Sequence, residues 1–354
     1  MNERMKRIID EDAYIIANSD LNWEKLKNKT VLISGANGYV PQYFVHGFMK
    51  RNDIFKDSIK VVALCRNKDR ADERFSEYYG RTDFKLLIQD VCEKINYDDK
   101  VDYIIHAASP AGTVNRYENL LATFDANVLG CRNLLEMARK NAAQFLLISS
   151  IDIYGKNNTG ERLKETSYGV LDPLNVRNIY SCSKRTAETL CACYSKDGVL
   201  VKIIRPSQIL AGGIALDDGR LHIDFISQML KGNQIVLKGD GTPRRTFLYI
   251  TDAITGMLLV LTEGKTGEAY NLCSENGEAS VLELARIMAS CVQDREIDII
   301  YNMETRNTDP AVTQVISNMC GSSDKIHELG WSAHVSLQEA CRRMMKYYGL
   351  FDNQ

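Results

Sequence analysis

Short apolar runs alternate with amphipathic helical patterns along the first 206 residues, and this alternation limits the folds open to the chain more than any other feature. The runs are rich in Val, Ile and Leu, which is typical of strands that are covered on both faces. Strands that alternate with helices in this way predict an α/β protein with a doubly wound parallel sheet. The expected strands are 30–34, 60–65, 84–90, 102–108, 145–150 and 199–206.

The segments outside this alternation predict two further parts. Residues 3–28 have a helical, amphipathic pattern, and beyond residue 206 the alternation weakens while loops such as GG, DDG and GDG become frequent. We expect the chain to return to the sheet once, near the apolar segment 247–252. The predicted division is an N-terminal helical extension at 1–29, a sheet domain at 30–206 plus about 246–270, and a smaller C-terminal substrate-binding portion at 207–245 plus 271–354.

The bulk properties exclude several classes of protein. A formal net charge of −2 over 354 residues gives no electrostatic reason to bind nucleic acid or a membrane surface. No apolar run approaches the roughly 20 residues that span a bilayer, and the charged first residues lack the apolar stretch of a secretory signal. The ten cysteines are scattered without the spacing of a zinc site. We therefore expect no metal, and reduced, buried thiols in a cytoplasmic protein.

A glycine-rich turn follows the first expected strand, in the segment VLISGANGYVPQYF. Gly35 and Gly38 permit a tight turn and a close backbone approach to a pyrophosphate, which the N-terminus of the next helix favours. This turn in the first βα unit predicts dinucleotide binding by a Rossmann-type domain. Pro41 stands where a small residue usually packs the helix on the strand, and proline is tolerated in a first helical turn. The same turn contains Asn37, Tyr39 and Val40.

The ends of the second and third strands hold residues suited to the adenosine half of a dinucleotide. An acid at the end of the second strand binds the 2′-hydroxyl of NAD, whereas an arginine accepts the 2′-phosphate of NADP. The chain has Arg66 there, followed by Lys68 and Arg70, which favours NADP; a solvated surface arginine is the alternative interpretation. Asp90 ends the third strand, where its carboxylate is expected to meet the adenine amino group.

Tyr180 and Lys184 are four residues apart in the segment NIYSCSKRTAETLC, so they lie one above the other on a helix face. About one such spacing is expected by chance in a chain with 17 tyrosines. A tyrosine with a pKa of about 10 is a poor base at neutral pH, and a lysine one helical turn away favours the phenolate. Whether the pair is catalytic therefore depends on the other motifs.

Taken in chain order, the motifs resemble those of the extended short-chain dehydrogenases, over about residue 28 to the end. The likeness includes the later segments RRTFLYITD and ELGW. It is greatest to members that act on nucleotide sugars, namely 4-epimerases, 4,6-dehydratases and UDP-glucuronate decarboxylases; HAASPA and DDGRLHIDF are most similar to the decarboxylases. The motifs are Gly35-x-x-Gly38, Asp90-Val91, HAASPA at 106–111, NVLG with Asn127, Ser149-Ser150-x-x-x-Tyr154-Gly155, Tyr180-x-x-x-Lys184 and Arg205-Pro206.

The resemblance implies an NAD(P)-dependent enzyme that oxidises a sugar carbon, usually C4, of a nucleotide-linked sugar and regenerates its cofactor in the same cycle. NAD is the expected cofactor and NADP the alternative. Tyr180 is then the acid/base, Lys184 its electrostatic partner, and Ser150 the group that hydrogen-bonds the sugar oxygen; Asp152 is a further catalytic candidate. The implied cofactor-binding residues are Gly35, Asn37, Gly38, Tyr39, Val40, Arg66, Asp90, Val91, Ala107, Ala108, Ser109, Asn127, Tyr180 and Lys184.

The substrate side only partly follows the family. Arg245 matches the diphosphate-binding arginine, a role that suits the guanidinium fork. Gln208 replaces an expected asparagine, and the second arginine of the decarboxylases falls near Asn318 and is missing. Arg220 is another source of positive charge. The implied substrate-binding residues are Pro110, Ser150, Gln208, Arg220 and Arg245.

The residues after Ser150 bear on the type of reaction. Similar dehydratases have Asp-Glu and decarboxylases Ser-Glu at the positions occupied here by Ile151 and Asp152. A 4-epimerase needs no acid there, so the sequence favours a 4-epimerase. The alternatives are a UDP-glucuronate decarboxylase-like enzyme, a 4,6-dehydratase, and a net NADPH-dependent reductase of a keto-sugar, which Arg66 favours. Asp152 is otherwise a strand-end aspartate bonded to backbone N–H groups, and His106 is assigned no acid–base role.

Two helical segments have more apolar positions than one core-facing stripe requires. They are residues 119–140 and the helix with Tyr180 and Lys184. The family resemblance points to a four-helix interface between two subunits. The sequence therefore predicts a homodimer.

Overall fold

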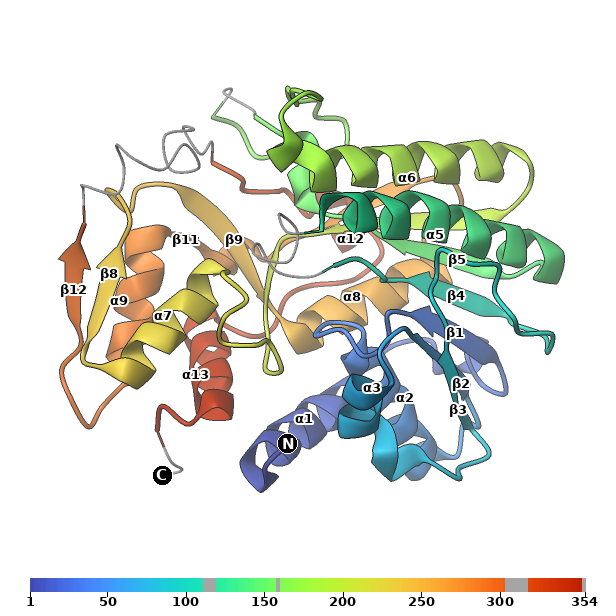
Figure 1. Ribbon diagram of the computed structural model, residues 1–354, viewed down its shortest axis with the longest axis horizontal. Coiled ribbons are helices and arrows are strands. Elements are labelled where there is room, and N and C mark those ends of the chain that lie inside the picture. The colour runs from blue at the N-terminus through green and yellow to red at the C-terminus, as the bar shows by residue number, and fades with distance from the viewer. Residues whose placement is uncertain (111–118, 157–159, 303–317, 352–354) are drawn as a thin grey trace.

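The structure is a computed structural model that describes residues 1–110, 119–156, 160–302 and 318–351. Its largest sheet has seven parallel strands in the order β10-β6-β5-β4-β1-β2-β3, with helices on both faces (Figure 1). The chain runs outward from β1 in both directions, which is the order of a Rossmann-type doubly wound sheet. The strands are β1 (Thr30–Ser34), β2 (Lys60–Cys65), β3 (Phe84–Ile88), β4 (Tyr103–His106), β5 (Gln144–Ile148), β6 (Leu200–Pro206) and β10 (Ala269–Leu272).

Alternate residues of each strand enter two separate cores, as the two-residue period of a strand requires. Val31 and Ile33 of β1 belong to one core with α1, α2 and α8, whereas Leu32 belongs to the other with α5 and α6. On that second face α5 and α6 lie side by side (Figure 1). The bounds of these helices, and of α3, which follows β2, are α1 (Glu3–Ala17), α2 (Gln42–Phe55), α3 (Lys68–Phe75), α5 (Leu120–Asn141), α6 (Ile179–Lys196) and α8 (Ile250–Glu263).

The six strands predicted from the apolar runs are confirmed, each within two residues at either end. The predicted return to the sheet near 247–252 is wrong. Strand β9 (Arg244–Tyr249) takes the first part of that segment into a separate sheet, and α8 begins at Ile250. The strand that rejoins the main sheet is β10, parallel to β6. The error has a physical cause, because an apolar run indicates a strand but not the sheet in which the strand pairs.

The smaller C-terminal portion holds two short sheets. In the first, β9 pairs in parallel with β7 and antiparallel with β11; in the second, β8 and β12 are parallel. The exact division of the chain into domains stays a prediction. The elements are β7 (Gln208–Leu210), α7 (Leu221–Lys231), β8 (Gln234–Leu237), β11 (Glu278–Ser280), α9 (Val281–Cys291), β12 (Asp298–Tyr301), α12 (Asp324–His327) and α13 (Leu337–Tyr348).

Helix α1 forms the expected N-terminal extension, but it ends at Ala17 and only a short 3-10 turn, Trp23–Lys25, follows before β1. It packs against α2, α8 and α13. Asp12 of α1 is fully buried and accepts hydrogen bonds from the hydroxyl of Tyr249 at 2.9 Å and from Nη2 of Arg343 at 2.8 Å. Burial raises the pKa of Asp12 to about 6, against the opposing effects of Arg343 and Tyr249.

Two further expectations concern the whole chain. In the described residues, none of the helices combines the length and the apolar character that crossing a bilayer would require. All ten cysteines fall within described segments and none is paired in a disulfide. The expected burial of the thiols holds for six of them, whereas Cys92, Cys182 and Cys291 are partly buried and Cys193 is exposed.

Candidate active site

A cavity of about 530 Å³ lies at the carboxyl ends of the main strands, where doubly wound sheets bind their ligands. Every predicted site residue lines it except Asn127 and Arg245. His106 does not line it either; it is buried, and its Nδ1 bonds Ser34 Oγ at 2.8 Å. The predicted residues in the lining are Gly35, Asn37, Gly38, Tyr39, Val40, Arg66, Asp90, Val91, Ala107, Ala108, Ser109, Pro110, Ser150, Asp152, Tyr180, Lys184, Gln208 and Arg220.

The glycine turn between β1 and α2 forms one wall of the cavity. Gly35 has a φ of +63°, and a Cβ added to it would lie 2.8 Å from the Cα of Ala108. Only glycine therefore allows the turn to lie so close to the loop after β4. Pro41, with a φ of −67°, precedes the first residue of α2, so the helix forms as expected. A turn with glycine at Gly35 and Gly38, next to a helix N-terminus, fits the pyrophosphate of a dinucleotide.

The residues assigned to the adenosine lie together at the ends of β2 and β3. Arg66 Nη1 is 3.5 Å from Oδ2 of Asp90, and the Arg66 side chain is 70% exposed. Burial acts to raise the pKa of Asp90, but the Cys92 backbone N–H and Arg66 outweigh it and hold that pKa below its usual value. Asp90 is therefore a charged carboxylate, and Arg66 reaches it from the solvent side of the cavity.

The four catalytic candidates, Ser150, Asp152, Tyr180 and Lys184, all line the cavity. On α6, Lys184 Nζ lies 5.8 Å from the centre of the Tyr180 ring. Lys184 is only 2% exposed, and its Nζ donates to the carbonyl oxygen of Ile148 at 2.8 Å. Ser150 Oγ accepts from the backbone N–H of Asp152 at 3.1 Å. A buried amine is thereby fixed between the end of β5 and the phenol.

A partly buried ion pair joins β6 to α6 beside these groups and also binds the residue that follows β5. Arg205 donates from Nη2 and Nε to the two carboxylate oxygens of Glu188, at 2.7 and 3.0 Å. Ser149 Oγ donates to the same carboxylate at 2.5 Å, and Arg205 Nη1 donates to the hydroxyl of Tyr154 at 2.8 Å. Bidentate pairs of this kind fix geometry as well as contributing energy. Ser149, Tyr154 and Arg205 thus support the neighbouring Ser150 and α6.

Asn127 lies behind the cavity rather than in its lining. Its Nδ2 donates to Ser183 Oγ at 2.9 Å, and that hydroxyl donates to the carbonyl oxygen of Tyr180 at 2.9 Å. Asn127 is fully buried on α5. In this structure it supports the helix that carries Tyr180, and its assignment to the cofactor stays a prediction.

The predicted substrate arginines lie in different settings. Arg245, on β9, is outside the cavity lining, and its Nη1 donates to the carbonyl oxygen of Arg244 at 2.8 Å. Burial lowers the pKa of Arg245 and the charge of Asp152 opposes that change, so the two charges interact. Arg220 lies in the lining, with Nε 3.3 Å from Oδ1 of Asp218. Arg220 therefore brings a positive charge to the cavity directly, whereas Arg245 lies outside the lining and interacts with the charge of Asp152.

The sequence analysis missed several lining residues, of which Arg74 of α3 has the most informative contacts. Its Nη1 donates to the carbonyl oxygen of Gly38 at 3.1 Å and its Nη2 to that of Gly213 at 2.8 Å. Nothing in the segment KDRADERF distinguishes this arginine from a solvated one. The other polar lining residues not predicted are Asn67, Arg70, Gln89, Asn119, Ser149, Ser207, Asp217 and Asp218.

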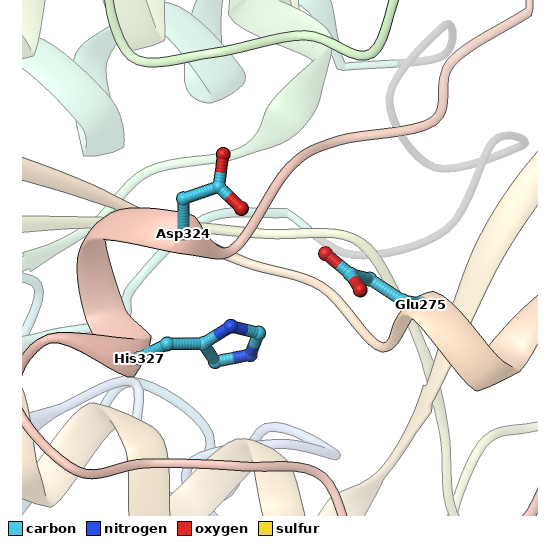
Figure 2. Close-up of side chains that lie close together, drawn as sticks. All are labelled: Glu275, Asp324 and His327. Atoms are coloured by element: carbon cyan, nitrogen blue, oxygen red, sulfur yellow. The ribbon is translucent and has the colours of Figure 1, made fainter.

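One group of potential metal ligands lies outside the cavity (Figure 2). Glu275 lies in a short 3-10 helix, and Asp324 and His327 lie in α12. Their ligand atoms are within 4.8 Å of one another, and all three residues are exposed. Exposed acidic groups often lie together without a metal ion, and we assign this group no part in the chemistry of the cavity.

The doubly wound sheet, the glycine turn and the Ser150, Tyr180 and Lys184 side chains around one cavity define an extended short-chain dehydrogenase. The chain belongs, more particularly, to the NAD dependent epimerase/dehydratase family, whose sequence profile it matches over residues 31–273. The protein is accordingly an NAD-dependent enzyme of a family that acts on nucleotide sugars.

Individual relatives agree with this assignment. The chain is 31% identical over 324 residues to UDP-glucuronic acid decarboxylase 2 of Arabidopsis thaliana, covering 91% of this chain and 68% of that protein. The fold is similar to that of UDP-glucose 4-epimerase from Thermotoga maritima, with a TM-score of 0.74, 19% identity and coverage of 90% and 98%. It is also similar to UDP-glucuronic acid 4-epimerase from Bacillus cereus, with a TM-score of 0.73, 20% identity and the same coverage.

Proposed function

We propose that the protein oxidises C4 of a UDP-linked sugar and returns the hydride in the same turnover, inverting C4 as a 4-epimerase. The observation that carries the proposal is the placement of Ser150, Tyr180 and the buried Lys184 on one cavity with the glycine turn. A bound nicotinamide supplies the hydride acceptor. Tyr180 takes the proton of the C4 hydroxyl, Lys184 stabilises the phenolate, and Ser150 hydrogen-bonds the sugar oxygen.

Two features support epimerisation over the other routes. Only one acid, Asp152, follows Ser150 at the positions where the dehydratases have a pair. The decarboxylases' second arginine is expected near Asn318, where this chain has no arginine; Asn318 Oδ1 accepts from the backbone N–H of Arg244 at 3.1 Å, and Asn318 does not line the cavity. The chain thus lacks two groups that the other reactions use.

Decarboxylation of UDP-glucuronic acid is the second candidate function. It is favoured by the curated relatives, which include several UDP-glucuronic acid decarboxylases. In that reaction the C4 ketone drives loss of the carboxyl group as CO₂, and a proton is then added at C5. Asp152 is the acid in the lining nearest in sequence to Ser150 and is the candidate donor.

Asp152→Asn distinguishes the two routes. For a 4-epimerase we expect kcat to change by less than about tenfold, or ~1.4 kcal/mol, because no proton moves at C5. The assay follows UDP-glucose and UDP-glucuronic acid by mass and NMR, in deuterated water. Deuterium at C5 of the product, or loss of product with accumulation of reduced cofactor in the variant, would contradict the epimerase and support the decarboxylase.

The choice between NAD and NADP is tested at Arg66. The protein uses NAD, and we propose that the exposed Arg66 also binds the 2′-phosphate of NADP. Arg66→Ala should therefore weaken NADP binding more than NAD binding, because only NADP loses a charge-assisted contact. Calorimetric titration of the apo-protein with each cofactor measures both affinities. Unchanged affinities for both would contradict the contact.

We also propose a homodimer formed through α5 and α6. Both helices cover the same face of the sheet, and α5 has Leu121 and Leu129 exposed. Burial of these leucines against a second copy removes apolar surface from water. Light scattering at micromolar concentration should give twice the chain mass of 40.0 kDa. A monomeric mass would count against the pairing.

A further inference from the structure

The loop between β7 and α7 forms a second wall of the cavity. Its residues Gly213, Ile214, Ala215, Asp217, Asp218 and Arg220 belong to the lining. The back of this loop is held by α13, because the hydroxyl of Tyr348 donates to the carbonyl oxygen of Ile214 at 2.7 Å and accepts from its N–H at 3.0 Å. The hydroxyl of Tyr43, on α2, donates to the carbonyl oxygen of Gly212 at 3.3 Å. We call residues 211–220 the β7–α7 loop.

Arg74 joins this loop to the glycine turn with a single guanidinium group. One of its nitrogens donates to Gly38 in the turn and another to Gly213 in the loop, across 36 and 139 residues of sequence respectively. Gly213 has a φ of +89°, and a Cβ there would lie 2.6 Å from Gln42 Nε2. The loop therefore approaches the start of α2 closely, and Arg74 fixes that approach through both carbonyl groups.

Arg74 is partly buried, and its charge is satisfied here by backbone carbonyl groups. In the described part of the chain it forms no ion pair with a carboxylate, and burial lowers its pKa. Removing a charge from water without a counter-charge is costly, so the two carbonyl contacts are what compensates its position. A second contact joins the same two segments, since the Arg220 guanidinium carbon lies 4.4 Å from the centre of the Tyr39 ring.

We propose that Arg74 is a positioning residue that couples the glycine turn to the β7–α7 loop, so that a bound dinucleotide orders the loop and raises affinity for the nucleotide sugar. The inference rests on the proposed function for its second ligand. A dinucleotide bound to the turn limits the movement of the Gly38 carbonyl group. Because the same planar guanidinium also donates to the carbonyl oxygen of Gly213, the movement of Gly213 is limited as well. Coupling between two ligands is reciprocal, and typical couplings change affinity by about 5- to 150-fold.

Hydrogen exchange tests the first half of the inference without any sugar. In the wild type, NAD⁺ should slow backbone exchange in both the glycine turn and residues 211–220. In Arg74→Met, compared at equal NAD⁺ occupancy, the turn should stay protected while the loop loses its protection. Arg74→Lys retains the charge but cannot reach both carbonyls as a fork, so it should also lose the loop protection. Undiminished loop protection in both variants would overturn the coupling.

Lys68→Met is the matched control. It removes the same charge from the same helix, but Lys68 is exposed, pairs with Asp72 within α3 and does not line the cavity. Its exchange pattern with NAD⁺ should match the wild type. Loss of loop protection in this control would assign the effect to the charge of α3 in general and overturn the specific role of Arg74.

Affinity for UDP, measured by calorimetry with and without saturating NAD⁺, tests the second half. The wild type should bind UDP at least about fivefold more tightly with NAD⁺, and the ratio should approach one in Arg74→Lys. If UDP binds with the same ratio in both proteins, the inference is overturned while the proposed function stands. If UDP binds to neither form of the wild type, the proposed function fails and the inference fails with it.

Discussion

Tyr180→Phe should lower kcat at least about a hundredfold, which is the lower end of the effect of losing a general acid/base. The change removes only the hydroxyl that exchanges a proton with the sugar, and leaves the ring beside Lys184. Affinity for NAD should be retained because the glycine turn is untouched. Turnover of the nucleotide sugar and calorimetric titration with NAD measure the two effects separately.

Tyr194→Phe is the matched control for this experiment. Tyr194 lies on the same helix, but its hydroxyl donates to Glu136 and it does not line the cavity. Its turnover should be close to that of the wild type. Near wild-type turnover in Tyr180→Phe, with product still formed, would refute the assignment of Tyr180 as the acid/base.

Arg343→Met should lower the free energy of unfolding by about 3–5 kcal/mol, which is the usual effect of removing one partner of a buried ion pair. Asp12 has no exposed surface, so removing Arg343 leaves a buried carboxylate without its ion-pair partner. Urea unfolding at pH 7 measures the change. Arg342→Met, one residue away and exposed, is the control and should stay within about 0.5 kcal/mol of the wild type. Equal stabilities of the two variants would contradict the role of the pair.

The pKa of Asp12 adds a pH dependence with a definite sign. Its pKa is raised to about 6 in the folded protein, above its ordinary value of 3.8. The folded state therefore holds a proton that the unfolded chain has already released, so the contribution of Asp12 to stability is present below pH ~4 and is lost as pH rises through ~6. The stability of the wild type relative to Asp12→Asn should fall over this window. A difference that is constant or rises with pH would refute the assignment.

The strands of the main sheet, and the part of the cavity wall at their carboxyl ends, could be predicted from local sequence patterns. Both depend on residues that are close together in the chain. The glycine turn and the ends of β2, β3 and β5 are each set by the strand just before them. The sheet in which the segment 247–252 pairs could not be predicted, because an apolar run carries no information about its partner strand. The contact of Asn127 with Ser183 spans 56 residues and could not be predicted from local patterns, while its assignment to the cofactor stays a prediction.

Arg74 shows why the remaining site residues could not be predicted. Its two partners are carbonyl groups, and a carbonyl group is the same in every residue of the chain. No residue type at Gly38 or Gly213 therefore indicates an arginine in α3. Contacts to backbone from a distant helix become visible only when the fold has brought the segments together.

The pairing of Asp12 with Arg343 has a consequence for how the chain is made. The two residues are 331 positions apart, so almost the whole chain must emerge from the ribosome before α1 can meet α13. Until then α1 can pack against α2 and α8, and Asp12 lacks the guanidinium of Arg343. Contacts between such distant segments form slowly because the intervening chain must first be ordered. Helix α1 thus completes its packing only after α13, more than 300 residues later in the chain, has been made.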